Sequence, residues 1–278
     1  MSKQYENRLI RVFDYMSANL DGDLSLDALA EVAAMSRFHW HRVFRAMTGE
    51  TQADAVRRLR LTRAAHWLVE TDWPIGEILR RSGFANERSF IRAFTALHGL
   101  TPAAFRQRGA LPPPPTLPAK GQTTMYPVDI LDQPARRLAA VSHRGPYLEI
   151  GAAFDKISAI LAARGEGGKG RTMAGIFYDD PSQTPETELR SHAAVEVEPD
   201  FPIDAPMEEV RLPAGRHAVM QYTGPYSGLS AAYDQLYCDW LPGSGEEPAD
   251  SPVFEVYRNT PMDTEPDKLR TDLMLPLK

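Results

Sequence analysis

The chain has 278 residues, of which 43% are hydrophobic and 24% charged, an ordinary composition for a globular protein long enough to hold two domains with cores of their own. The 31 Lys and Arg against 37 Asp and Glu give a formal charge of −6, and the single cysteine excludes an internal disulfide. The sequence opens without a signal-peptide pattern and contains no apolar run near the roughly 18 residues of a membrane span, so we expect a cytoplasmic protein with no membrane partner.

The charge is divided unevenly along the chain. Residues 1–108 hold 16 basic and 12 acidic residues, whereas residues 109–278 hold 15 and 25. The boundary is a proline-rich stretch, Gly109–Gln122, whose composition favours a stiff, extended spacer. We therefore predict an N-terminal domain over 1–108 that meets a polyanion, a linker over 109–122 and a second domain over 123–278.

Two segments of the first domain, fifty residues apart, repeat one pattern. SRFHWHRVFRAMTG begins at Ser36 and NERSFIRAFTALHG begins at Asn86. Each follows a short helical pattern, so the pair predicts two helix-turn-helix units. The Arg- and Ala-rich residues 51–70 between them predict a helix of about 20 residues, hence about 30 Å long. That length is close to one turn of duplex DNA, roughly 34 Å, and would let both units enter successive major grooves.

The first unit shows its helix boundaries and its two faces. Ser25 is the expected N-cap of a helix over Leu26–Ala33, and Ser36 is the expected cap of the next helix. A periodicity of 100° per residue assigns one face of that second helix to the core, and these residues are Trp40, Val43, Phe44 and Met47. The opposite face would display an aromatic ring among basic groups, which suits a thymine methyl and guanine edges in a major groove.

By this pattern the DNA-binding residues of the two units are Arg37, Phe38, His41, Arg42, Arg45, Arg88, Ser89 and Arg92. The alternative is a pair of ordinary amphipathic helices with solvated arginines. Two copies in register with a duplex-sized spacer disfavour that alternative.

Residues 20–108 resemble the DNA-binding domain of the AraC/XylS family of transcriptional regulators. The segments that carry the resemblance are LSLDALAEVAAMSRFHWHRVFRAMTGET and IGEILRRSGFANERSFIRAFTALHGLTPAAFR. The resemblance implies that Phe38, His41 and Arg42 reach bases in one groove, with Arg88 and Arg92 in the next. One departure is Ala33, which stands where the second unit has a glycine, so we expect a different first turn.

The second half of the chain also repeats itself, at an offset of 79. AAVSHRGPYLEIGAAFDKI, from Ala139, matches AVMQYTGPYSGLSAAYDQL, from Ala218. Each half predicts strand, turn, helix, strand and strand, which makes this domain α+β. Two such halves most simply pair their sheets about a pseudo-twofold axis and leave a cleft between the helices and the sheet.

Alternation along the strand near Phe254 places Glu255 and Tyr257 together on one face. In the first repeat the offset assigns Ile176 to the position of Glu255, and Tyr178 to that of Tyr257. The cleft would then hold one carboxylate among aromatic rings, an arrangement that suits a lipophilic cation. The predicted ligand-binding residues are Tyr147, Phe177, Tyr226, Trp240, Glu255 and Tyr257, with Tyr178 and Tyr233 as further aromatic candidates. The alternative is an exposed edge-strand glutamate with core tyrosines.

Residues 123–278 resemble the GyrI-like effector-binding domain found behind some AraC-type regulators. PAGRHAVMQYTGPY, YDQLYCDWLPGSG and FEVYRNTP…DKLRTDLMLPLK carry the resemblance, which implies that Glu255 faces the ligand pocket.

The two resemblances together predict a one-component transcriptional regulator. Its partners would be double-stranded promoter DNA and a small cationic, aromatic effector, and recruitment of RNA polymerase by the N-terminal half is left open. We expect no catalytic residues, no cofactor and no metal. The alternatives are a GyrI-like hydrolase or a drug-sequestering protein fused to a DNA-binding domain, and an architectural DNA binder that takes no ligand.

Overall fold

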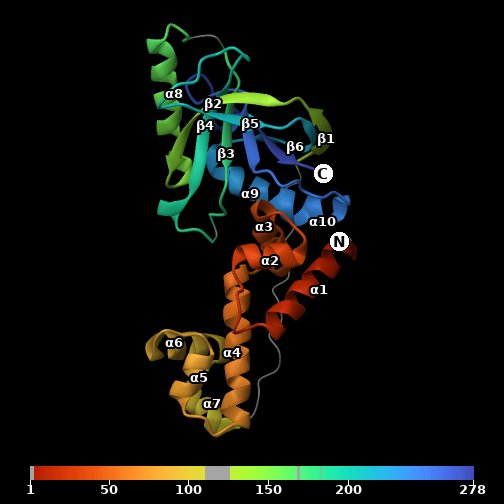
Figure 1. Ribbon diagram of the computed structural model, residues 1–278, viewed down its shortest axis with the longest axis vertical. Helices are drawn as coiled ribbons and strands as arrows, with labels where there is room; N and C mark the ends of the chain where they lie inside the picture. The colour runs from red at the N-terminus through yellow and green to blue at the C-terminus, as the bar shows by residue number, and fades with distance from the viewer. Residues whose placement is uncertain (1–2, 110–125, 168–169, 182) are drawn as a thin grey trace.

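The computed structural model describes residues 3–109, 126–167, 170–181 and 183–278, and consists of an all-helical N-terminal part and an α+β C-terminal part (Figure 1). Most of the predicted linker, residues 110–122, therefore lies outside the described residues. The helical part comprises α1 (Lys3–Ala18), α2 (Leu26–Ala33), α3 (Arg37–Thr48), α4 (Gln52–Glu70), α5 (Ile75–Arg81), α6 (Glu87–His98) and α7 (Pro102–Arg108). No helix among the described residues is long and apolar enough to cross a membrane.

The predicted caps and helix lengths of the N-terminal part are confirmed. The Ser25 hydroxyl accepts a hydrogen bond from the backbone N–H of Ala28, the third residue of α2. The Ser36 hydroxyl likewise accepts one from the backbone N–H of Phe38 and caps α3. The long helix α4 has 19 residues and runs from one helix-turn-helix unit to the other (Figure 1). At 1.5 Å per residue it separates the two units by about 28 Å.

The tight turn between the two helices of a helix-turn-helix unit has its positive φ at positions that differ by one residue between the two units. Gly83 has a φ of +73° after α5, and in the first unit the positive φ falls on Ala34, at +51°, one residue after Ala33, the counterpart of Gly83 at the offset of fifty. Ala33 itself ends α2 and is fully buried. An alanine in this left-handed conformation costs about 1–2 kcal/mol more than a glycine, because its Cβ approaches the following carbonyl oxygen.

Each helix-turn-helix unit has its own core. In the first, Trp40 and Phe44 of α3 pack against α1, α2 and α4 with their rings 5.3 Å apart. In the second, Phe90 and Phe94 of α6 occupy the corresponding positions, 5.7 Å apart. The fifty-residue repeat therefore corresponds to two similar three-dimensional units joined by α4.

The C-terminal part is one antiparallel sheet of eight strands in the order β1-β6-β8-β7-β3-β4-β2-β5. The strands are β1 (Val128–Gln133), β2 (Arg136–Arg144), β3 (Met173–Phe177), β4 (Arg190–Glu196), β5 (Glu208–Leu212), β6 (Gly215–Thr223), β7 (Val253–Tyr257) and β8 (Arg270–Pro276). The helices are α8 (Gly151–Ala163) in the first half and, in the second, the continuous run of α9 (Leu229–Asp234), a π-helical segment η4 (Gln235–Trp240) and α10 (Leu241–Ser244).

The two halves exchange their first strands, which the sequence did not predict. Strand β1 precedes the first repeat but pairs with β6 of the second, and β5 precedes the second repeat but pairs with β2 of the first. The halves meet at the centre of the sheet, where β3 pairs with β7. The expected pseudo-twofold arrangement is confirmed, and each half contributes an additional strand.

The repeated Gly-Pro-Tyr turns are held in the same way in both halves. Gly145 N donates to the carbonyl of Leu189, and Gly224 N donates to the carbonyl of Leu269, both at 2.9 Å. Both glycines have φ angles far into the positive range, +134° and +147°, which a side chain would oppose. The turns thereby fix the tyrosines that follow them, Tyr147 and Tyr226.

The expected match between the central strands is wrong by one residue. In the register of the sheet Glu255 lies opposite Gly175, and Phe254 lies opposite Ile176. Ile176 is buried in the cluster on the far face of the sheet, and Tyr178 lies with it, where its hydroxyl is 2.8 Å from His192 Nδ1. The symmetry mate of Glu255 is therefore a glycine, because the repeat lengthens from 79 to 80 residues between the helix and the strand.

The N-terminal helices pack directly against the C-terminal part. Tyr5 of α1 together with Val43 and Ala46 of α3 belong to the same buried cluster as residues of β6, β8 and η4. The Tyr5 hydroxyl donates to the carbonyl of Glu246 at 2.7 Å, and Arg8 forms an ion pair with Glu247. Figure 1 shows α3 lying against the α9–α10 run, with the chain termini close together.

Candidate functional site

A cavity of about 950 Å³ lies between the two halves of the effector domain. Its walls come from α8, from the α9–η4 run and from the central strands β3 and β7, and α3 of the N-terminal part closes one side. The aromatic side chains that line it are Tyr147, Phe154, Phe177, Tyr226, Tyr233, Tyr237 and Tyr257. Several rings meet edge to face, including Tyr147 with Phe177 and Tyr226 with Tyr257. The cavity is large enough for a drug-sized molecule, and aromatic and aliphatic side chains make up much of its lining.

Glu255 is the buried carboxylate at the floor of this cavity. It is 3% exposed and accepts two hydrogen bonds, from the Tyr233 hydroxyl at 3.0 Å and from the Tyr257 hydroxyl at 2.8 Å. Burial raises the pKa of Glu255 to about 7, and the two tyrosine hydroxyls and the nearby Arg42 oppose that rise. The carboxyl group is therefore divided between its neutral and ionised forms at physiological pH.

Further carboxylates surround the opening, which the sequence did not indicate. Asp155 of α8 and Asp234 of α9 occupy corresponding positions in the two repeats, and both are exposed at the cavity. Asp239 and Glu186 add two more exposed acidic groups. A concentration of negative charge at an opening raises the local concentration of cations.

Gly175 makes room for this arrangement. A Cβ atom there would lie 2.7 Å from the Tyr257 hydroxyl and 2.9 Å from a ring carbon of Phe177. Any side chain would thus displace the tyrosine that donates to Glu255. The signal in the sequence was a glycine inside a strand pattern, which commonly marks a close approach of other atoms.

Arg42 of α3 enters the cavity wall instead of facing solvent. Its guanidinium carbon lies 4.8 Å from the ring centre of Tyr233 and 5.1 Å from that of Tyr237. Arg42 Nη2 donates a long hydrogen bond, 3.5 Å, to the carbonyl of Asp179, whereas Nη1 is buried and has no hydrogen-bond partner among the described residues. No carboxylate in the described ranges lies within 4 Å of this guanidinium, so aromatic rings are its principal support.

The neighbouring histidines of α3 are buried in the same interface. His39 is fully buried, with Nδ1 2.7 Å from the Tyr237 hydroxyl and Nε2 3.0 Å from the carbonyl of Ser251. His41 is 2% exposed, and its Nε2 lies 3.6 Å from Asp180 Oδ2. Burial lowers the pKa of His39 to about 3 and that of His41 to about 4, so both are neutral at pH 7.

The outward face expected for α3 is therefore covered in this arrangement. The sequence assigned His41 and Arg42 to solvent and DNA, yet both lie against the effector domain. Val43, assigned to the helix-turn-helix core, is also buried at the interface. The reason is that α3 is packed on two sides, by its own unit and by η4.

The remaining predicted DNA-binding residues lie at the surface. On α3, Arg37 and Arg45 are exposed and Phe38 is half-buried, and Arg45 is at the edge of the cavity. On α6, Arg88 and Arg92 are exposed and Ser89 is half-buried. The second unit thus presents its reading face, whereas the first unit's face is covered at His41 and partly covered at Phe38 and Arg42.

Among the predicted ligand-binding residues, Tyr147, Phe177, Tyr226, Glu255 and Tyr257 converge on the cavity. Trp240 does not line it, because that residue packs against the cluster between β6, β8 and η4. Tyr237, which the sequence analysis did not single out, does line it. Tyr233 and Tyr237, four residues apart on the same helical run, are the two rings that hold Arg42.

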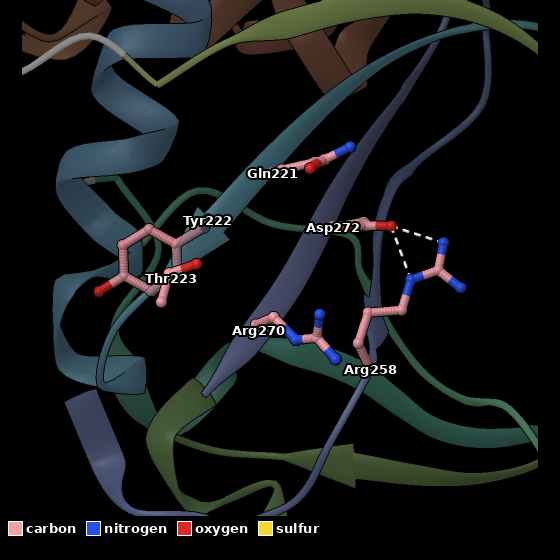
Figure 2. A pocket seen from close by; sticks show the side chains of 6 residues that line it. All are labelled: Gln221, Tyr222, Thr223, Arg258, Arg270 and Asp272. Atoms are coloured by element: carbon pink, nitrogen blue, oxygen red, sulfur yellow. Dashed lines mark hydrogen bonds and ion pairs between the residues drawn. The ribbon is translucent and has the colours of Figure 1, made fainter. Parts of the chain in front are cut away.

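A second, smaller depression of about 320 Å³ lies along β6 and β8 (Figure 2). It is lined by Gln221, Tyr222, Thr223, Arg258, Arg270 and Asp272. Arg258 Nε donates to Asp272 at 2.7 Å, so the acidic group there already has a basic partner. The ion pair and the other polar side chains of this lining distinguish the depression from the larger, aromatic-lined cavity.

Two family models match the chain. One, described as a GyrI-like small molecule binding domain, matches residues 126–278, and the other, a helix-turn-helix domain, matches residues 29–108.

Similar proteins share the helical part. The "Bifunctional transcriptional activator/DNA repair enzyme AdaA" of Bacillus subtilis is 34% identical over 96 residues, which is 34% of this chain and 46% of AdaA. The regulatory protein SoxS of Escherichia coli K12 is 31% identical over 94 residues, 34% of this chain and 88% of SoxS. The chain thus spans less than half of AdaA but most of SoxS.

A solved structure described as an EcmrR–DNA complex covers 55% of this chain and 57% of its own, with 16% identity and a TM-score of 0.46. A likeness of that size carries no argument about function.

Proposed function

The chain belongs to the GyrI-like family and joins that small-molecule binding domain to an AraC-type helix-turn-helix domain, and from this premise we propose that it is a DNA-binding transcriptional regulator whose effector is a lipophilic aromatic cation. The effector would bind in the cavity of about 950 Å³. The DNA would be read by α3 and α6 in successive major grooves, and RNA polymerase is the partner through which such a regulator would act on transcription.

One observation carries the proposal for the effector: a buried carboxylate at the floor of an aromatic cavity. Ring faces carry partial negative charge and attract cations, and several tyrosine and phenylalanine rings surround Glu255. A neutral apolar ligand would gain from the rings but not from the carboxylate. The exposed acids at the opening, Asp155 and Asp234, favour the same sign of charge.

The half-titrated state of Glu255 suits reversible capture of a cation. The neutral acid is tolerated in an empty, apolar site, because an isolated buried charge is costly. A bound cation would favour the ionised form and release the proton.

Two exposed arginines support the DNA-reading function of α6. Arg88 and Arg92 are one helical turn apart and point from the same face of the helix, which Asn86 caps through its side chain. Arginine at such positions donates two hydrogen bonds to a guanine edge. For α3 the same function requires that the helix leave the effector domain, because His41 and Arg42 are covered.

The effector proposal is tested with tetraphenylphosphonium, a permanently charged aromatic cation, against neutral triphenylphosphine oxide. We expect isothermal titration calorimetry to show binding of the cation to the full chain at least tenfold tighter than binding of the oxide. Equal affinities, or a preference for the oxide, would remove the charge argument.

The DNA proposal is tested by selecting duplexes from a random library with the full chain. We expect an enriched site with two recognition elements about one helical turn, roughly 10 base pairs, apart. Enrichment of a single element, or of none, would contradict reading by both units.

One feature favours a second candidate, a hydrolase. A carboxyl group with a pKa of about 7 beside two tyrosine hydroxyls is poised for general acid–base chemistry near neutral pH. This candidate predicts turnover of p-nitrophenyl esters by the full chain and its loss in Glu255→Gln. A sensor of cations predicts no turnover in either protein.

A further inference from the structure

Arg42 and the proposed effector require the same part of the cavity. The guanidinium lies over Tyr233 and Tyr237, and Tyr233 donates from its hydroxyl to Glu255. The proposed ligand would likewise place a positive charge near the face of this ring and the carboxylate to which its hydroxyl donates. The arginine thus occupies the cation subsite in the ligand-free protein.

The half-buried Arg42 is held there by few direct contacts. It has a long hydrogen bond to Asp179, one buried Nη1 without a hydrogen-bond partner in the described part of the chain, and two ring faces. A single cation–ring contact corresponds to a factor of about two to thirty in an equilibrium constant. A free cation that fits the cavity better can therefore displace the guanidinium.

Displacement would change more than the cavity, because Arg42 belongs to the helix that reads DNA in the first unit. The same face of α3 is anchored by Ser36 Oγ, which donates to Asp250 Oδ1 at 2.7 Å, and by His39, which contacts Tyr237 and Ser251. While these contacts persist, the effector domain covers the face that would enter a major groove.

We propose that Arg42 is a tethered competitor of the effector: it occupies the cation subsite when α3 is docked, and a bound cationic effector excludes it and thereby releases α3 for DNA. The inference rests on the proposed function, since it takes the effector to be a cation. It assigns the coupling between ligand and DNA to one side chain that has two mutually exclusive positions. Effector binding and docking of α3 then oppose each other, and effector and DNA favour each other.

For Arg42 we expect removal of the side chain to change ligand affinity in the opposite direction from removal of a residue that only lines the cavity. Removing a side chain that contacts a ligand weakens binding, whereas removing a competitor strengthens it. In Arg42→Gln the cation subsite is vacant, and we expect tetraphenylphosphonium to bind the full chain about tenfold more tightly than wild type. Arg42→Lys keeps a tethered cation and is expected to remain within about threefold of wild type.

A matched control is Arg11→Gln, which neutralises an exposed arginine of α1 outside the cavity. It should leave the affinity within twofold of wild type. Circular dichroism and thermal unfolding show whether each variant is folded. Weaker or unchanged binding of tetraphenylphosphonium by folded Arg42→Gln would overturn the competition.

Hydrogen–deuterium exchange gives a second readout on the wild-type chain. Saturating tetraphenylphosphonium should increase deuterium uptake across residues 36–48 of α3, and in Arg42→Gln the uptake should be high before the cation is added. Decreased uptake in α3 on addition of the cation would show that the ligand consolidates docking, which contradicts the inference. Absence of tetraphenylphosphonium binding to wild type and Arg42→Gln alike would instead overturn the proposed cation-sensing function, and the inference with it.

Discussion

Replacing Glu255 by glutamine tests the charge argument with little change of shape, because the amide oxygen can accept from one of the two hydroxyls of Tyr233 and Tyr257 and the amide NH2 can donate to the other. A cation about 5 Å from the carboxylate, in an effective dielectric of about 20, gains about 3 kcal/mol. With a pKa of about 7 the carboxyl group is half protonated at neutral pH, and ionising it costs about 0.4 kcal/mol. We therefore predict that Glu255→Gln weakens tetraphenylphosphonium binding by about 2–3 kcal/mol, roughly 30- to 150-fold.

The assay is calorimetric titration of wild type, Glu255→Gln and the exposed control Glu265→Gln with tetraphenylphosphonium and triphenylphosphine oxide. The oxide should bind the three proteins alike. A raised pKa also fixes the sign of the pH dependence: because the ionised fraction of Glu255 grows from about 9% at pH 6 to about 91% at pH 8, cation affinity in wild type should rise about tenfold over that range. Equal losses for cation and oxide in Glu255→Gln, or a flat pH profile in wild type, would refute this reasoning.

Three further predictions concern stability, docking and DNA. Gly175→Ala should lower the free energy of unfolding by about 1–3 kcal/mol, seen as a lower Tm, because the new Cβ would meet the Tyr257 hydroxyl at 2.7 Å; Gly243→Ala, with no atom within 4 Å of its Cβ, should not destabilise. Docking of α3 should weaken as pH falls below about 6.5, by about 1.4 kcal/mol at pH 5.5 for each of His39 and His41, because both are neutral when buried and protonate when released; hydrogen exchange of α3 that is unchanged between pH 7.5 and 5.5, after correction for the intrinsic rate, would contradict this. Arg92→Ala should weaken binding to a selected duplex by about 1–3 kcal/mol and relax preference in one element only; a uniform loss across sequences would make that arginine a phosphate contact.

The helical part shows how far local sequence rules reach. Serine caps and apolar spacing of three to four residues predicted both ends of α2 and the start of α3, since both signals act within one turn of helix. The positive φ at Ala34 was displaced by one position because the unit repeat is not strict through the turn. An alanine in a sequence does not indicate a left-handed backbone conformation, whereas a glycine such as Gly83 in the second unit does.

The effector domain shows where such rules fail. A repeat offset of 79 holds for Tyr147 and Tyr226 but becomes 80 at Gly175 and Glu255. Because successive side chains of a strand point to opposite faces, this single residue moved Ile176 from the expected cavity face to the other face. The exchanged strands β1 and β5 depend on pairing between distant segments, which periodicity alone does not reveal.

The docked position of α3 also lay beyond sequence reasoning, for a physical reason. A polar helix face with arginine and histidine has the same pattern whether it faces a phosphate backbone or the aromatic wall of another domain. Only the three-dimensional arrangement shows that Arg42 lies on Tyr233 and Tyr237, and that Val43 packs outside its own unit. Cavity residues within the domain, such as Glu255, were accessible because strand alternation is local.

We expect that α3 cannot dock and read DNA at the same time, because its docked face lies against the C-terminal part. Ser36 and Asp250 are in direct hydrogen-bond contact across the interface, so the variant Ser36→Cys, Asp250→Cys, Cys238→Ser places two thiols where a disulfide would lock the docked state. We predict that the oxidised protein binds a selected duplex at least 100-fold more weakly than the same protein after reduction, with tetraphenylphosphonium present in both. Equal affinities of the locked and reduced forms would contradict the account.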